Sequence, residues 1–222
     1  IYDNVTVINT ADELKEFRDK VNSGNTFENS YIYLKNDINL DINEIWVPIG
    51  VYDQNATSSR DGIKSSENKP FSGIFDGKNH TINGINIDSS KKAQGLFSFV
   101  KNATIENINI GPNNNFTFGD TYGAGIVAIT IGKGYVKNCK NYADMSNGNS
   151  AIAGAVIDTI TVENCINYGN LNNVNGGIVG SSNGTDWTEY SNTHCSIINC
   201  GNYGEILKSR DTHYLGRYCR LF

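Results

Sequence analysis

The sequence predicts an all-β chain, a right-handed parallel β-helix (solenoid) of about five coils with an N-terminal α-helical cap. Three observations predict it: a short apolar tetrad recurs along the chain, a second strand pattern recurs upstream of it, and one amphipathic helix precedes both. The expected organisation is one domain, with a helical cap over residues 1–30, β-helix repeats over 31–206 and a C-terminal tail or cap over 207–222.

The N-terminal segment has the features of an amphipathic helix. Thr10 and Glu13 occupy the positions of a capping box, in which the threonine caps the helix and the glutamate reaches back to it. Apolar residues then follow at helical spacing: Leu14, Phe17 and Val21. Because the first unit of a solenoid must cover the core that another coil would have covered, this helix is expected to close the N-terminal end. Tyr31–Leu34 and Asp37–Leu40 are expected to follow as strands.

From Phe71 onward a tetrad recurs with the form apolar, variable, Asn or Gly, apolar. Its copies are Ile82–Ile85, Ile105–Ile108, Val136–Cys139, Val162–Cys165 and Ile197–Cys200. They begin 23, 31, 26 and 35 residues apart, and polar inserts account for the longer intervals. The shortest interval gives a coil within the size range of solenoid repeats.

A second pattern, a small-residue strand, lies upstream of each tetrad. Its copies are Gly73–Asp76, Gly95–Ser98, Gly125–Ala128, Gly154–Ile157 and Gly177–Gly180. Each coil therefore carries at least two strands. An all-helical chain is excluded because no helical period continues after Gly24, and a β-sandwich would not require similar tetrads to recur in register.

The third residue of the tetrad is expected to turn the chain, because Asn and Gly enter the left-handed region at low cost. Stacked coils would then align Asn107, Asn138, Asn164 and Asn199 as a hydrogen-bonded ladder. The neighbouring inward column would be Ile85, Ile108, Cys139, Cys165 and Cys200. Buried free cysteines behave as small apolar side chains, so these thiols are expected to be reduced and inert.

Composition limits the possible partners. The 222 residues carry a formal net charge of -5 without a cluster of Lys or Arg, so nucleic acid is not expected as a partner. No apolar run approaches the roughly 18 residues of a membrane-spanning helix, so membrane insertion is not expected either. The 33 Asn and 23 Gly suit a chain that turns often. Five cysteines exclude a fully paired disulfide framework, although Cys195 and Cys219 could pair with each other.

No catalytic residue, metal or cofactor is assigned. Cys195, Cys200, His213 and Cys219 have a spacing loosely like a zinc knuckle, but Cys200 already belongs to the inward column. Asp76–His80 gathers charged groups, yet Asp-Gly is first a turn signal. A glycosidase needs paired carboxylates along one face, and the candidate aspartates do not occupy equivalent coil positions: Asp120, Asp144, Asp158 and Asp186.

The insert from Ser181 to Thr193 supplies the candidate binding residues, Trp187 and Tyr190, because aromatic groups on loops are common binding anchors. The competing interpretation, slightly favoured for the tryptophan, is that Trp187 folds back over the solenoid wall or caps its C-terminal end. Three other tyrosines recur at one offset and are expected to form a structural stack: Tyr142, Tyr168 and Tyr203.

Two stretches carry a family resemblance. Asn164–Leu171 followed by Gly176–Gly180 resembles the GLUG repeat of bacterial surface proteins, and Asn199–Ile206 repeats its first half. Trp46–Gly50 with Phe71–Ile82 is similar to the coil that precedes such repeats, and to the non-catalytic β-helical region of some secreted immunoglobulin-A metallopeptidases and adhesins. The resemblance implies a β-helical module outside the cell.

The leading functional hypothesis is a non-catalytic, adhesin-like module, secreted or on the cell surface, that presents a surface for host glycan or protein. The first alternative is a small carbohydrate-active enzyme, a polysaccharide lyase or glycosidase built on the same scaffold. The second is an accessory region of a larger secreted protease. Further domains of a larger surface protein are possible partners in either arrangement.

Overall fold

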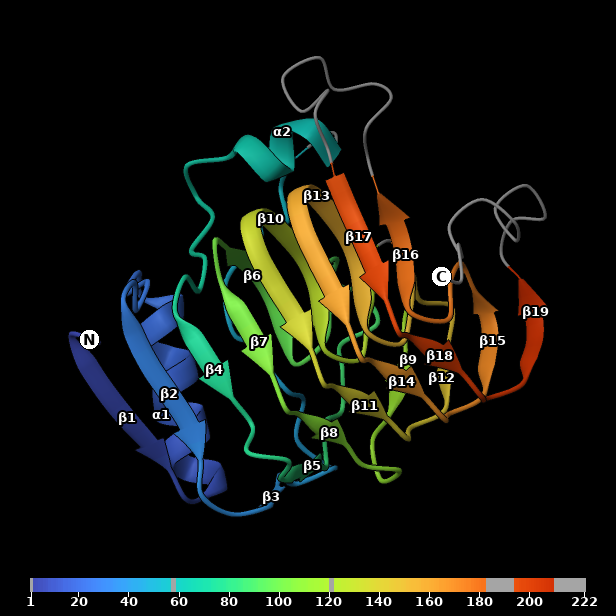
Figure 1. Ribbon diagram of the computed structural model, residues 1–222, viewed down its shortest axis with the longest axis horizontal. Helices are drawn as coiled ribbons and strands as arrows, with labels where there is room; N and C mark the ends of the chain where they lie inside the picture. The colour runs from blue at the N-terminus through green and yellow to red at the C-terminus, as the bar shows by residue number, and fades with distance from the viewer. Residues whose placement is uncertain (1, 57–58, 120–121, 183–193, 210–222) are drawn as a thin grey trace.

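The computed structural model describes residues 2–56, 59–119, 122–182 and 194–209. The chain is an all-β parallel β-solenoid of about six turns, with two helices in this described part. Successive coils follow one another from β1 at the N-terminal end to β19 at the other end (Figure 1). The predicted fold class is confirmed, with one turn more than the tetrads indicate.

Three parallel sheets form the walls of the solenoid. The first contains β1 (Asn4–Ile8), β2 (Ser30–Leu34), β4 (Ile74–Asp76), β6 (Phe97–Lys101), β7 (Thr104–Glu106), β10 (Val127–Lys137), β13 (Ala153–Glu163), β16 (Val179–Ser182) and β17 (His194–Ile198). The second contains β3 (Ile38–Asn39), β5 (Thr81–Asn83), β8 (Asn109–Ile110), β11 (Lys140–Asn141), β14 (Ile166–Asn167) and β18 (Gly201–Asn202). The third contains β9 (Phe116–Thr117), β12 (Met145–Ser146), β15 (Leu171–Val174) and β19 (Ile206–Ser209).

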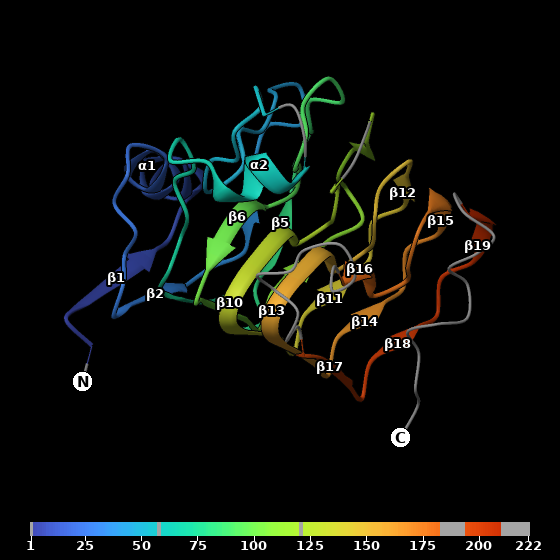
Figure 2. The same cartoon turned by 90° about the horizontal axis from the view of Figure 1, so that it is seen from above.

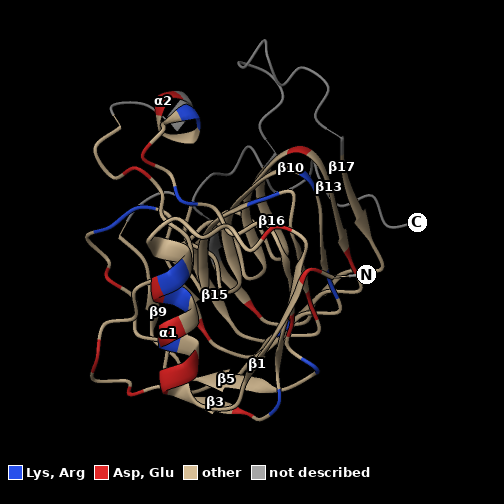
Figure 3. Cartoon of the chain, turned by 90° about the vertical axis from the view of Figure 1, so that its left-hand side faces the viewer, with Lys and Arg blue, Asp and Glu red and all other residues tan. Residues whose placement is uncertain are grey.

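The expected helix is α1 (Ala11–Asn22), with Thr10 as its N-cap. The Thr10 hydroxyl accepts a hydrogen bond from the Glu13 amide, while the Glu13 carboxylate accepts from the amide of Asn9 rather than from the cap residue. Its apolar residues Leu14, Phe17 and Val21 are buried. Seen from the N-terminal end, α1 lies over the stacked coils (Figure 3), so the helix closes this end as predicted.

The core runs along the inside of the solenoid. The ring of Phe17 reaches it from α1 and contacts Phe27, Phe71 and Phe75, with ring centroids 5.0–5.7 Å apart. Further along, the interior is mainly aliphatic, with the stacked rings of Phe116 and Phe118 packed into it. The predicted inward column is confirmed in its last four members, because the register of β8, β11, β14 and β18 aligns Ile108 and the three cysteines that precede these strands. All four described cysteines, including Cys195, are free.

The tetrad alignment is wrong at its first copy. Phe75 and Asp76 pair with Ile105 and Glu106, so the equivalent of Ile105 in the preceding coil is Phe75. The segment Ile82–Ile85 begins instead in β5 of the second sheet, and its last isoleucine therefore lies outside the inward column. The segment that follows Phe75 is Asp-Gly-Lys and lacks the second apolar residue of the tetrad, so the sequence pattern matched a segment of the next strand instead.

The second pattern also needs correction. Ala153 pairs with both Val127 and Val179, so the true equivalent of Gly125–Ala128 is residues 151–154 and not Gly154–Ile157. The copy at Gly73–Asp76 likewise aligns with β7, not with β6. Small residues occur at two places in each coil, which is why a pattern of glycines gave the wrong offset.

The asparagine ladder is confirmed for three of its members. The side-chain amide of Asn164 donates to Asn138 at 3.2 Å, and that of Asn138 donates to Asn107 at 3.0 Å. These residues and Asn199 share a positive φ between 50° and 56°, which is the left-handed turn expected at this corner. A second, buried ladder joins Asn141, Asn167 and Asn202, at 2.8 and 2.6 Å.

The short helix α2 (Ser59–Lys64) was not predicted and belongs to a connection that leaves the coils. It lies above the first sheet, outside the solenoid (Figures 1 and 2). Ile63 and Tyr52 of this connection form a second apolar cluster with outward residues of the sheet, including Phe99 and Ile129. In the described part of the chain, no helix is long and apolar enough to cross a membrane.

Candidate functional site

The outer face of the first sheet carries an exposed aromatic patch at its N-terminal end. Side chains of β2 alternate between buried and half-buried, so Tyr31 and Tyr33 point outward. Val5 and Val7 of the edge strand β1 pair in register with these two tyrosines and are 60% and 36% exposed. We define the aromatic patch as these four residues together with Tyr2 and Lys78.

The rings of the patch are held in a fixed arrangement. Tyr2 stacks on Tyr31 with centroids 5.0 Å apart and planes 16° from parallel, and Tyr33 lies 5.8 Å from Tyr31. The ammonium of Lys78 lies 5.4 and 5.9 Å from the centroids of Tyr31 and Tyr33. Tyr2 is 48% exposed, so the patch offers solvent both ring surface and a cation.

Asp76 fixes the patch from below. Its side chain is 4% exposed and accepts hydrogen bonds from the Tyr31 hydroxyl at 2.6 Å and the Asn107 amide at 2.9 Å. The backbone N–H of Lys78 donates at 2.8 Å, and its ammonium lies 3.0 Å from the same carboxylate. Burial alone would raise the pKa of Asp76, but the hydrogen bonds outweigh burial and the pKa is lowered.

The charges within the patch compensate each other. Burial, followed by the hydrogen bond to Asp76, raises the pKa of Tyr31, so its phenol stays protonated. The hydroxyl of Tyr31 and the carboxylate of Asp76 raise the pKa of Lys78, so its ammonium stays charged. Asp76 and Lys78 therefore form a neutral pair, and the exposed polar groups of the patch are a phenol and an ammonium.

Asp76 also ends the asparagine ladder. Asn107 donates to it, and Asn138 and Asn164 continue the chain of amides across the following coils. Because every amide in this chain has a partner on the neighbouring coil, the position of Asp76 depends on the stacking of the solenoid. The patch is therefore built on a rigid element.

This geometry suits binding better than proton transfer. The carboxylate of Asp76 is buried and engaged by four donor groups, which leaves little basicity for a catalytic role. The following residues form the predicted turn, since the N–H of His80 donates to the carbonyl of Gly77 at 2.8 Å. Half-exposed tyrosines with adjacent polar groups are common in binding sites, where the ring supplies contact area and the hydroxyl supplies direction.

The predicted site residues, Trp187 and Tyr190, are not among the residues that define the patch. Trp187 and Tyr190 lie outside the described residues, as do His213 and Cys219, so the loop site stays a prediction, whereas Cys195 is a free thiol. Among the residues that the structure describes, no group of three His, Cys, Asp or Glu could hold a metal ion. A sequence signal for the patch did exist: apolar or aromatic residues occupy the outward positions of both strands, Val5 and Val7 in β1 and Tyr31 and Tyr33 in β2.

The second group of tyrosines forms the predicted stack. Tyr142 and Tyr168 have centroids 4.9 Å apart, and Tyr168 and Tyr203 are 5.6 Å apart, both nearly parallel. These rings stand on a corner of the coils, with 40% or more of each residue exposed. Unlike Tyr31 in the patch, these tyrosines have no hydrogen-bond partner for their hydroxyls among the described residues, so the stack serves as a control surface.

Fold and patch together define the class: a parallel β-solenoid that presents aromatic side chains on an outer sheet face. No family model matches the chain, and no curated protein matches it. One solved structure is similar, a protein from Bacteroides ovatus described as a "putative immunoglobulin A1 protease", at 18% sequence identity and a TM-score of 0.44. The similarity covers 90% of this chain and 66% of that protein, so the chain spans just under two thirds of its length.

Proposed function

We propose that the chain is a non-catalytic, adhesin-like module, secreted or displayed on the cell surface, that binds host glycan through the aromatic patch. One observation carries the proposal: three tyrosines and a lysine stand on the outer face of a sheet, fixed by the buried carboxylate of Asp76. A bacterial cell-surface location fits the repeat resemblance and remains part of the proposal.

A sugar ring fits the patch for a chemical reason. Its C–H face can pack against the exposed ring surface of Tyr2 and Tyr33, while its hydroxyls can accept from the Lys78 ammonium or from a phenol. The rigid sheet keeps these groups in place before binding, so little entropy is lost on ordering them. Because Lys78 is already neutralised by Asp76, neutral sugars are expected to bind at least as well as acidic ones.

The test is a glycan array probed with labelled protein. The wild-type chain is compared with the double variant Tyr2→Ala/Tyr33→Ala, which removes two rings and leaves the Tyr31–Asp76 hydrogen bond intact. The matched control is Tyr142→Ala/Tyr168→Ala, which removes two rings from the other stack. Trp187→Ala/Tyr190→Ala tests the loop site in the same assay. Glycan signals lost only in the first variant support the patch, whereas loss only in the loop variant assigns binding to Trp187 and Tyr190.

The enzyme alternative is tested with the same protein. Incubation with a panel of polysaccharides, followed by measurement of new reducing ends and of unsaturated uronic products, detects a glycosidase or a lyase. We expect binding without product. If an oligosaccharide-releasing activity co-purifies with the protein, the chain is a carbohydrate-active enzyme and the non-catalytic interpretation is wrong. If neither activity is found, the accessory region of a larger secreted protease becomes the preferred interpretation.

A further inference from the structure

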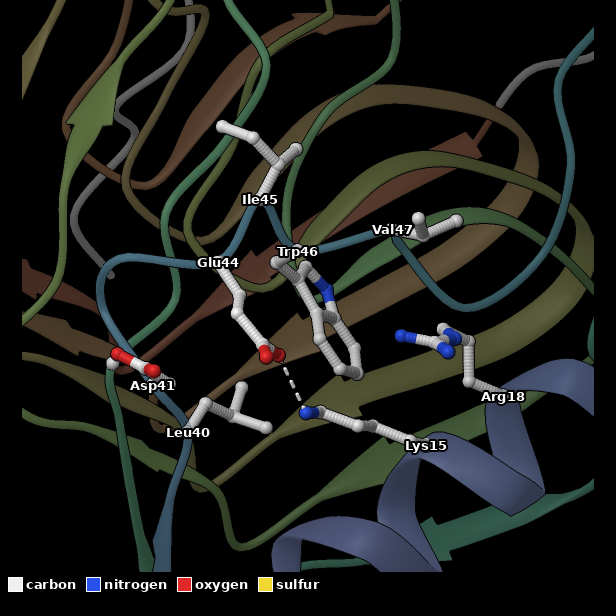
Figure 4. A pocket seen from close by; sticks show the side chains of 9 residues that line it. Lys15, Arg18, Leu40, Asp41, Glu44, Ile45, Trp46 and Val47 are labelled. Atoms are coloured by element: carbon white, nitrogen blue, oxygen red, sulfur yellow. Dashed lines mark hydrogen bonds and ion pairs between the residues drawn. The ribbon is translucent and has the colours of Figure 1, made fainter.

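Two adjoining hollows form a groove on another side of the N-terminal coils. The first, about 210 Å³, lies between α1 and the connection that follows β3; Figure 4 shows Lys15 and Arg18 reaching from the helix toward Glu44 and Trp46 on that connection. The second, about 490 Å³, crosses three stacked coils. Leu40 and Gly84 line both hollows, which therefore adjoin, and we refer to the two together as the groove.

Amide side chains line the second hollow. Asn39, Asn83 and Asn113 come from three successive coils, one above another. Asn83 donates to Asn39 over a long 3.4 Å, and among the described residues no hydrogen bond is made by the side-chain amide of Asn113. Each side-chain amide can both donate and accept hydrogen bonds. The groove therefore offers free donors and acceptors that the N–H and C=O groups of a peptide backbone can bind.

Aliphatic side chains lie beside these amides. Ile42, Ile45 and Val47 are 42%, 54% and 51% exposed, within six residues of one surface connection. Pro112 and the half-buried Leu40 extend the apolar lining. The Trp46 ring is 3% exposed, so no aromatic face in the lining is open for a sugar to stack on, in contrast to the aromatic patch.

Among the described residues of the groove, one carboxylate, that of Asp41, has no ion-pair partner. Lys15 pairs with Glu44 at 2.7 Å, and Arg18 pairs with Asp19 at 2.8 Å while lying over the Trp46 ring. Asp41 accepts only from the backbone and side chain of Asn43, and no Lys or Arg of the described chain forms an ion pair with it. These hydrogen bonds lower the pKa of Asp41, which keeps it charged at neutral pH.

We propose that this groove binds an extended polypeptide segment that carries a branched aliphatic side chain next to a lysine or arginine. The peptide groups bind the amides of Asn39 and Asn113, and the aliphatic side chain packs on Ile42 and Leu40. The basic side chain lies against Asp41. This site is separate from the aromatic patch and does not rest on glycan binding.

The experiment is a selection of random decapeptides, displayed on phage, against the immobilised full chain. The recovered peptides are then synthesised and titrated by fluorescence anisotropy. Asp41→Asn keeps the acceptor oxygen that Asn43 uses and removes the charge. Asp88→Asn is its matched control, because Asp88 accepts similar hydrogen bonds from Ser90 in a turn outside the groove. Ile42→Ser removes the apolar contact. Its control is Leu207→Ser, at an exposed position of the last coil.

We expect the recovered peptides to share an aliphatic residue beside a basic one. Asp41→Asn should weaken their binding about fivefold, the scale of one exposed ion pair, and this loss should shrink at high salt. Ile42→Ser should weaken it at least as much, while both controls and Tyr2→Ala/Tyr33→Ala should bind like the wild type. Peptides that bind Asp41→Asn and Ile42→Ser unchanged, or a selection that enriches nothing above background, would overturn the proposal.

Discussion

At the scale of single residues, the buried carboxylate of Asp76 has the largest structural role in the patch. It satisfies the hydroxyl of one tyrosine, the amide of one asparagine and both donors of Lys78. A buried acceptor with several donors is costly to replace, because each donor left without a partner loses its hydrogen bond in a dry site.

Asp76→Asn should therefore lower the free energy of unfolding by about 1–3 kcal/mol at pH 7. The folded-state pKa of Asp76 is lowered, so its ionised form stabilises the fold above the ordinary value of 3.8, and this stabilisation is lost as the pH falls through the folded pKa. The difference between wild type and variant should then narrow below pH 3.8. Urea denaturation between pH 3 and pH 7 measures this difference in stability. The control is Glu28→Gln, a substitution at an exposed position. An equal difference at all pH values would contradict the role assigned to the charge.

The asparagines at the coil corners combine two effects, a left-handed backbone and a ladder of amides. Asn138 has a φ of 56° and donates to Asn107. Its side chain is exposed, so the ladder bonds should contribute less than the backbone preference.

Asn138→Gly and Asn138→Ala separate these effects. Glycine enters the left-handed region freely and loses only the ladder bonds, whereas alanine loses the bonds and is strained as well. We expect Asn138→Ala to be the less stable variant by about 1 kcal/mol. Thermal or urea unfolding of the two proteins measures the difference. Equal stabilities would mean that the amides, and not the turn, account for the recurrence of asparagine at this position.

At the scale of elements, α1 closes the solenoid through one aromatic side chain. Phe17 is 2% exposed and touches three other phenylalanines in the first coils. Without this ring the N-terminal end would contain a cavity directly beneath the strands that carry the aromatic patch.

Phe17→Ala should lower the free energy of unfolding by about 3–5 kcal/mol. Glu16→Ala, at the adjacent exposed position of the same helix, should change it by less than about 0.5 kcal/mol. Calorimetry of both variants tests this. A Phe17→Ala protein as stable as the wild type would show that α1 packs against the coils without capping them.

The elements also show what the sequence could predict. The helix was predictable because Leu14, Phe17 and Val21 follow a threonine cap at regular spacing. The edge strand β1 and the helix α2 were not, because neither has a periodic pattern long enough to recognise. The strand is stabilised by pairing with β2, and α2 by contact of its connection with the outer sheet face. Both elements are therefore stabilised by tertiary contacts, which the local sequence does not show.

At the scale of the whole molecule, the solenoid was predictable because stacking forces equivalent residues into columns. Its register was not fully predictable, because the segment Ile82–Ile85 has the tetrad pattern but lies in the second sheet, whereas the residue that pairs with Ile105 is Phe75, and only strand pairing shows this. The sixth turn was missed because the coil that contains β2 and β3 lacks the tetrad. The patch was missed because its members, Tyr2, Tyr33 and Lys78, lie far apart in sequence and meet only across stacked strands.

A molecule in which each coil contacts only its neighbours should open from its ends. Strands β10 and β13 lie between coils on both sides, whereas β1 and β19 are sheet edges. We expect amide hydrogen exchange to be slowest in the two central strands and fastest in the two edge strands. Mass spectrometry of peptic fragments measures this profile. Uniform protection along the chain would contradict a stack of coils that interact in sequence.

The affinity of the aromatic patch for a glycan is the most direct test of the proposed binding function. Isothermal titration with the best glycan from the array should show that Tyr2→Ala/Tyr33→Ala weakens binding about tenfold or more, as expected when central aromatic contacts are removed. Tyr142→Ala/Tyr168→Ala should leave the affinity unchanged. Equal affinities for wild type and the patch variant, with both proteins folded, would contradict the central claim that this face is the binding surface of the solenoid.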